Sequence, residues 1–190
     1  MNALRHILLL LAAFLVAQAS YAQSEQLIEA NRKYQAGDLA GARTLLDAVV
    51  KEPENARSPE AWVLRGFVYK DLFKAEPAGS TADLLRDEAL ASLFTSTVVD
   101  TAREFYQSST QAYDFLCKTL FNDAARALNE MNDARAIALY AKYKQCVLRL
   151  NPGQDLKPRD IEFNNALGTV YTKNFKIGRA SCRERVSPRV

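Results

Sequence analysis

Apolar residues between positions 24 and 174 recur three or four places apart, which is the spacing of one face of an α-helix. No alternating run of valine, isoleucine or threonine lies between turn residues, as a half-buried strand would require. Alanine, leucine, arginine, glutamate and lysine dominate this part of the chain, and all of them favour helices. The pattern therefore predicts an all-α chain, with helices that include residues 25–35, 83–98, 133–150 and 160–174.

Two short motifs predict where helices begin. Gly37 and Asp38 form a tight turn before an apolar helical stripe. Ser58 followed by Pro59 is typical of an N-cap with proline at the first helical position. An enlarged loop is expected at residues 75–81, which contain glycine, proline and serine.

The first 22 residues have the organisation of a secretory signal peptide. A short basic start precedes the ten apolar residues 7–16, and the small residues Ser20 and Ala22 mark a cleavage site after Ala22, with an alternative after Ala19. Ten apolar residues are too few for a membrane-spanning helix, which needs about 20. We therefore expect an exported protein of the periplasm, cell envelope or exterior of a bacterium, without a stable membrane span after cleavage.

Residues 177–190 differ from the rest of the chain. They begin with a run, 177–186, that has no helical or strand periodicity and resembles the translated read-through of a sequencing adapter. Four arginines and one glutamate give this segment a charge of +3, which equals the formal net charge of the whole chain. We therefore expect an artefactual tail on a neutral protein, which disfavours nucleic acid as a partner. The alternative is a genuine basic tail that contacts anionic partners.

Two segments share a motif in which a glycine stands three positions before a tyrosine. The first contains Trp62, Gly66 and Tyr69. In a helix such a glycine lets a neighbouring helix approach closely, and the tyrosine fills the space one turn later. The second segment contains Leu167, Gly168 and Tyr171, and a divergent third, 51 residues after the first, contains Tyr113, Cys117 and Leu120.

These segments resemble the first helix of a tetratricopeptide repeat, whose pattern is Trp, Leu-Gly and Tyr followed by Ala, Phe, Ala and Pro in a second helix. The second half of the pattern appears where Ala42, Leu46 and Val49 take the packing positions. The repeat-defining core that the resemblance implies consists of Trp62, Gly66, Tyr69, Ala42, Leu167, Gly168 and Tyr171. The resemblance implies a right-handed superhelix of antiparallel helix pairs, a TPR-like α-solenoid truncated in its fourth repeat. A generic helical bundle is the alternative. The expected organisation is a signal peptide (1–22), a repeat domain (23–176) with repeats at about 24–54, 59–99, 108–152 and an incomplete 158–176, and the tail (177–190).

Catalytic chemistry is poorly represented in the chain. The single histidine, His6, lies in the expected signal peptide, so the mature chain has no histidine for a triad, a metal site or a general base. No Cys-x-x-Cys, glycine-rich phosphate loop or Gly-x-Ser-x-Gly pattern occurs. We therefore expect a protein that is not an enzyme and has no cofactor or metal.

The repeat region contains two cysteines, Cys117 and Cys146. They stand 14 residues before and 15 residues after Met131, which lies in the expected turn between two antiparallel helices. They therefore fall at about the same level, and both are on the apolar stripe. Because exported proteins meet oxidising conditions, the spacing suggests a disulfide; two buried unpaired thiols are the alternative.

The resemblance also implies a concave groove lined by the first helix of each repeat, and hence binding of a protein or peptide. Groove lysines and aromatic residues suit an extended acidic or C-terminal peptide. In the alternative, the lysines are merely solvated and Phe67 packs against the next repeat. The expected groove residues are Asn31, Tyr34, Phe67, Lys70, Lys118, Phe121, Asn122, Thr169 and Lys173.

The function expected from the sequence is a non-catalytic interaction scaffold of the bacterial cell envelope. One alternative is a component of an outer-membrane assembly or nutrient-uptake complex. Another is the repeat region of an enzyme whose catalytic part is missing from this chain.

The helix expected at 160–174 has no following partner, so Leu167, Val170 and Tyr171 are expected to keep an incompletely covered apolar edge. Deleting residues 177–190 is expected to change the folding of the chain little and to leave its Tm nearly unchanged, because those residues carry no packing stripe. A large loss of thermal stability on this deletion would show that the tail is a structural element.

Overall fold

The structure is a computed structural model that describes residues 25–185, with side chains described as far as Lys173. The expected signal peptide, 1–22, lies outside the described residues. Within the described part every regular element is a helix and there is no strand, which confirms the all-α prediction. The chain divides into two compact units, 1–113 and 114–190, so the boundary falls inside α5.

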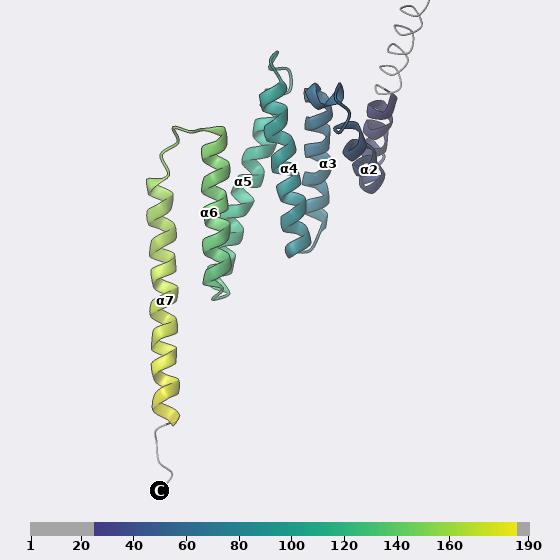
Figure 1. Ribbon diagram of the computed structural model, residues 1–190. Coiled ribbons are helices and arrows are strands. Elements are labelled where there is room, and N and C mark those ends of the chain that lie inside the picture. Colours follow the sequence, from purple (N-terminus) through teal and green to yellow (C-terminus); the bar gives the residue numbers. More distant parts are fainter. Residues whose placement is uncertain (1–24, 186–190) are drawn as a thin grey trace, which may run out of the picture. The chain divides into compact units, whose positions relative to one another are not determined.

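The helices follow one another with short connections (Figure 1). Residues 25–35 form the first described helix. The others are α2 (Leu39–Val49), a short 3₁₀ helix (Asn55–Arg57), α3 (Pro59–Ala75), α4 (Ser80–Val99), α5 (Tyr106–Asn129), α6 (Asp133–Leu150) and α7 (Lys157–Arg185).

The two predicted helix starts are present in the first unit. Gly37 has a φ of 80°, and the side chain of Asp38 accepts a hydrogen bond of 2.8 Å from the backbone N–H three residues later. The Ser58 hydroxyl caps α3 in the same way at 3.2 Å, with Pro59 at its first position. These caps satisfy N–H groups that the helix itself leaves unpaired.

The first described helix, α2 and α3 share a core of small and branched residues. The predicted packing residues of α2 are all fully buried, because they lie on the one stripe that faces α3. The core residues are Ala30, Ala42, Leu46, Leu64 and Val68, with Val49 and Ala61 beside them.

Helix α3 lies between α2 and α4 (Figure 1). A Cβ atom built on Gly66 would lie 2.6 Å from both Cγ and Cδ2 of Leu93, so α4 approaches α3 as closely as the sequence motif predicts. The Ser96 hydroxyl donates a hydrogen bond to the carbonyl of Pro59 at 3.2 Å, which places the end of α4 beside the start of α3. The two helices therefore form an antiparallel pair.

The other two motif residues in α3 differ in burial. Tyr69 is buried, as expected of a repeat-defining core residue. Trp62 is half-buried, and its indole N–H donates to the carbonyl of Ala56 at 3.0 Å. One face of Trp62 therefore stays accessible on the surface of the first unit.

An aromatic cluster joins α5, α6 and α7 in the second unit. The rings of Tyr140 and Phe163 stack with centroids 4.0 Å apart and an interplanar angle of 7°. Phe121 lies 6.1 Å from Tyr140 and 5.3 Å from Tyr143, measured between ring centroids. The Tyr140 hydroxyl donates to Asp160 at 2.9 Å, so α6 and α7 are joined by polar as well as aromatic contacts.

The second copy of the glycine motif is packed differently from the first. The expectation of a repeat-defining core residue is wrong for Gly168, which is exposed, and an added Cβ there would meet nothing within 4 Å. Tyr171 is 48% exposed and Leu167 is half-buried, so these two keep the expected uncovered edge. The expectation is wrong for Val170, which is 8% exposed and turns toward the interior of the unit. The same spacing therefore gives a packed core only where a following helix covers it.

Helix α7 is longer than the sequence predicts. It begins at Lys157, and its backbone stays helical to Arg185 instead of ending at Asn174. Once a helix is nucleated, each further residue adds one hydrogen bond at little cost, and no proline interrupts residues 174–185. Helical conformation therefore needs no apolar periodicity in this segment.

Replacing Gly66 by alanine is expected to destabilise the first unit by about 1–3 kcal/mol, because the buried Leu93 has no room to move away from the new Cβ atom. Trp62 fluorescence during urea unfolding measures the change, since Trp62 lies in the same helix and is the only tryptophan.

Gly168→Ala is the matched control. It introduces the same methyl group into a helix without a clash, so it should raise stability by up to about 1 kcal/mol through helix propensity. Far-UV circular dichroism reports on this helix. Equal stability of Gly66→Ala and the unchanged chain would show that α3 and α4 do not need the close approach.

Candidate functional site

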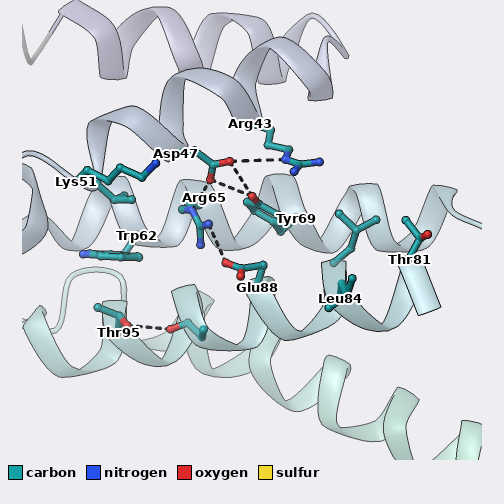
Figure 2. Close-up of a pocket in the computed structure, with 13 residues that line it drawn as sticks. Arg43, Asp47, Lys51, Trp62, Arg65, Tyr69, Thr81, Leu84, Glu88 and Thr95 are labelled. Carbon is teal, nitrogen blue, oxygen red and sulfur yellow. Dashed lines mark hydrogen bonds and ion pairs between the residues drawn. The ribbon is translucent and has the colours of Figure 1, made fainter. Parts of the chain in front are cut away.

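An open cavity of about 670 Å³ lies on the surface of the first unit, among α2, α3 and α4. Figure 2 shows its lining, with Trp62 toward one end, Leu84 and Thr81 toward the other, and charged side chains between them. The Leu84 side chain is 66% exposed, so an apolar surface is accessible beside the charges. All lining residues belong to the first unit.

The guanidinium group of Arg65 lies between the other charged side chains of this cavity, and the Arg65 side chain is only 11% exposed. Its Nε lies 2.9 Å from Asp47 Oδ1 of α2, and its Nη2 lies 2.8 Å from Glu88 Oε2 of α4. Nη1 donates to the hydroxyl of Ser92 at 2.6 Å. One side chain of α3 therefore links both neighbouring helices, and its charge is compensated by two carboxylates.

Two aromatic rings flank the same guanidinium group. Its central carbon lies 4.4 Å from the ring centroid of Tyr69 and 6.0 Å from that of Trp62, distances at which a cation is attracted to the ring. The Tyr69 hydroxyl donates to Asp47 at 2.9 Å. Burial and this hydrogen bond raise the pKa of Tyr69.

Burial and the neighbouring groups have opposite effects on the pKa of Arg65. Partial burial opposes its charge, but hydrogen bonds with Glu88 and Asp47 and the nearby Tyr69 outweigh that effect and raise the pKa. Arg65 therefore stays charged at any pH that the protein meets.

The rim of the cavity carries two further cations. Arg43 Nε lies 3.6 Å from Asp47, and the Arg43 side chain is half exposed. The exposed Lys51 side chain makes no hydrogen bond or ion pair with a described residue. With Arg65, three basic and two acidic side chains line the cavity, so its net charge is +1.

The groove residues expected in the first unit lie away from this cavity. The Tyr34 hydroxyl donates to Asp71 at 2.7 Å, and burial together with that bond raises the pKa of Tyr34 to about 12. Lys70 lies 4.8 Å above the ring of Phe67 and 3.5 Å from Asp71. Asn31 is exposed. Phe67 and Lys70 therefore contact each other, on a different side of α3.

The groove residues expected in the second unit fall into separate environments. Phe121 belongs to the aromatic cluster, with the guanidinium group of Arg159 4.9 Å above its ring. Lys118 is exposed and pairs with Asp114 at 2.6 Å, and Asn122 is exposed. Thr169 and Lys173 line a depression of about 530 Å³ on α7, together with Asn164, Asn165, Gly168 and Thr172.

The expected cysteine pair is brought together as two thiols and not as a disulfide. The Cys117 side chain is hydrogen-bonded to Cys146, as their positions around the α5–α6 turn predict. Cys117 is buried and Cys146 is half-buried. The disulfide is therefore absent from the structure, while the proximity that it requires is present.

Residues 25–173, whose side chains are described, contain no group of three histidine, cysteine or acidic side chains placed to hold a metal ion. None of the described helices has the length and apolar character that crossing a membrane requires. No protein-family model matches the chain, and no curated protein or solved structure matches it either.

Sequence reasoning missed the Arg65 network. The available signal was that Arg65 stands immediately before Gly66, where the repeat pattern has leucine. A charged residue next to a close helix contact needs partners on the neighbouring helix. The sequence around its two acidic partners, Asp47 and Glu88, is that of an ordinary solvent-exposed helix face. Nothing in it distinguishes these two residues from other exposed acidic residues.

Arg65→Met and Asp47→Asn are expected to be coupled in a double-mutant cycle by about 1–2 kcal/mol, because each removes one partner of a largely buried ion pair. The free energy of unfolding, followed by Trp62 fluorescence, measures the coupling. Additive effects on the free energy of unfolding would show that the ion pair between Arg65 and Asp47 contributes no interaction energy to stability. Arg159→Met with Glu162→Gln, an exposed pair on α7, is the matched control and should show coupling below about 0.5 kcal/mol by circular dichroism.

Proposed function

We propose that this chain is a non-catalytic scaffold that binds an extended acidic segment of a partner protein at the cavity of the first unit. The observation that carries the proposal is the combination, in one open cavity, of an accessible tryptophan face, an exposed leucine and uncompensated positive charge. Such a surface suits a segment in which acidic and apolar residues lie side by side.

The charges within the cavity favour this choice of ligand. Asp47 and Glu88 are engaged by Arg65, so they repel an incoming carboxylate less than free acids would. Lys51 and Arg43 remain at the rim, where a ligand carboxylate can reach them. Electrostatic attraction at a rim mainly increases the association rate and the selectivity for acidic partners.

The apolar part of the cavity provides the remaining binding energy. Trp62 and Leu84 lie toward opposite ends of the cavity, and each offers apolar surface to a leucine or phenylalanine side chain of the ligand. Aromatic anchors of this kind contribute much of the affinity in protein interfaces.

We further propose that the antiparallel helix pairs form a TPR-like solenoid and that the protein acts in the bacterial cell envelope after export. The pairing of α3 with α4 through Gly66, and the repeat-like placement of Ala42 and Tyr69 in the core, support the first statement. The signal-peptide pattern of residues 1–22 supports the second.

An array of extended peptides, in which aspartate or glutamate flanks one leucine or phenylalanine, tests the proposal. Binding to acidic peptides is expected to shift the fluorescence of Trp62, because the indole lines the cavity. A matched array with lysine in place of the acids is the control, and equal binding to both arrays would contradict the proposed charge selectivity.

Lys51→Glu is expected to weaken binding of the selected acidic peptide about tenfold, because it reverses the rim charge. Lys70→Glu, on another side of α3, is the matched control and should leave the Kd unchanged. The opposite result, loss with Lys70→Glu and retention with Lys51→Glu, would move the site to the groove predicted from the sequence.

A further inference from the structure

The second unit contains two cysteines on facing helices. Cys117 lies in α5 and Cys146 in α6. The turn between these helices fixes their register: Met131 adopts a φ of 59°, and the N–H of Asn132 donates to the carbonyl of Ala127 at 2.8 Å. This closure is typical of a helix C-terminus that reverses the chain tightly.

The register brings the two thiols into contact. The Cys117 side chain is hydrogen-bonded to Cys146. Phe121, one turn after Cys117, lies against Tyr143, which is nearly one turn before Cys146, so the helices remain in contact around this level. A disulfide needs sulfur atoms about 2 Å apart, and two thiols in hydrogen-bond contact need only a small side-chain adjustment to reach that distance.

The two cysteine residues differ in accessibility. Cys117 is 2% exposed, whereas Cys146 is half-buried and the more accessible of the two. The hydrogen bond with Cys146 and burial raise the pKa of the Cys117 thiol. Cys146 is therefore the residue that meets an external reagent first.

We propose that Cys117 and Cys146 form a reversible disulfide that joins α5 to α6, with Cys146 as the attacking and Cys117 as the resolving residue. The inference is independent of the peptide-binding proposal, because it concerns the second unit alone. It also assigns the order in which the two cysteines react, which their spacing in the sequence cannot predict.

The reaction requires an external disulfide as oxidant. The Cys146 thiolate attacks one sulfur of that disulfide, forms a mixed disulfide and releases one thiol. The hydrogen bond that opposed ionisation of Cys117 is then lost, and the Cys117 thiolate attacks the Cys146 sulfur and releases the second thiol. The two cysteines lose two electrons and two protons, and the external disulfide gains them as two thiols.

Oxidised glutathione provides the external disulfide for a test on the full chain, in a Cys182→Ser background that removes the only other cysteine. After oxidation the chain is unfolded without reductant in the presence of an alkylating reagent, and its mass is measured. We expect no alkyl label and no glutathione adduct, and two labels once reductant is added. Two labels without reductant, or persistent glutathione adducts, would overturn the proposal.

Single variants test the assigned order. Cys117→Ala should accumulate a stable glutathione adduct on Cys146, because the resolving thiol is missing. Cys146→Ala should form an adduct at least tenfold more slowly while folded, because Cys117 is buried. Equal rates would overturn the assignment of Cys146 as the attacking residue.

The thermal transition provides a second readout. Closing a loop of about 30 residues is expected to raise the Tm of the oxidised second unit by about 10 °C over the reduced form. A Cys117→Ala/Cys146→Ala variant in the same Cys182→Ser background, which can form neither the bridge nor a glutathione adduct, should lack any difference between oxidising and reducing buffer. An oxidised form no more stable than the reduced form would show that the bridge does not fit the native α5–α6 pair.

Discussion

The absence of a side chain at Gly66 determines how α4 lies against α3. Leu93 occupies the space that any larger residue at position 66 would need, so the two helices approach at this point more closely than other side chains allow. Arg65, the preceding residue, is thereby held within reach of Ser92 and Glu88 on α4. The cavity of the first unit depends on this contact, because its two walls are set by the position of α4 relative to α3.

The Arg65 network follows from the same constraint. A guanidinium group has donors that point in several directions, and here Asp47 of α2 and Glu88 of α4 accept from different sides. Burying that charge without partners would cost several kcal/mol. Arg65 therefore makes the arrangement of α2, α3 and α4 more specific, since a shifted helix would leave a carboxylate or the guanidinium group unpaired.

The sequence predicts the local parts of the fold well. The tight turn at Gly37 and Asp38, the cap at Ser58, the buried stripe of α2 and the limits of α6 are decided by neighbouring residues, and the structure confirms each of them. The cap that Asp38 provides to α2 was not predicted. The close approach at Gly66 is also visible in the sequence, because a glycine within a helix is costly unless a neighbour needs the space. Gly168 shows the limit of this reasoning, since the same motif there lies on an open surface.

The site is less predictable, because its residues meet only through tertiary contacts. Asp47, Arg65 and Glu88 come from three helices, and none of the three local patterns indicates a partner. Phe121 illustrates the converse problem: its spacing indicates a groove position, but Tyr143 and Arg159 cover it from α6 and α7. Helical periodicity identifies the face of a helix, whereas what covers that face depends on the next helix.

The two units use charged residues beside aromatic rings in different ways. In the first, Arg65 is enclosed between Tyr69 and Trp62 and is compensated by acids, so further cations at the rim determine what a ligand meets. In the second, Asp160 accepts from Tyr140 and pairs with Lys144 at 3.1 Å, which closes the aromatic cluster at the α6–α7 contact. The first arrangement leaves accessible apolar surface next to positive charge, and the second uses its charges to join helices. This difference is the physical reason why we propose ligand binding on the first unit and not on the second.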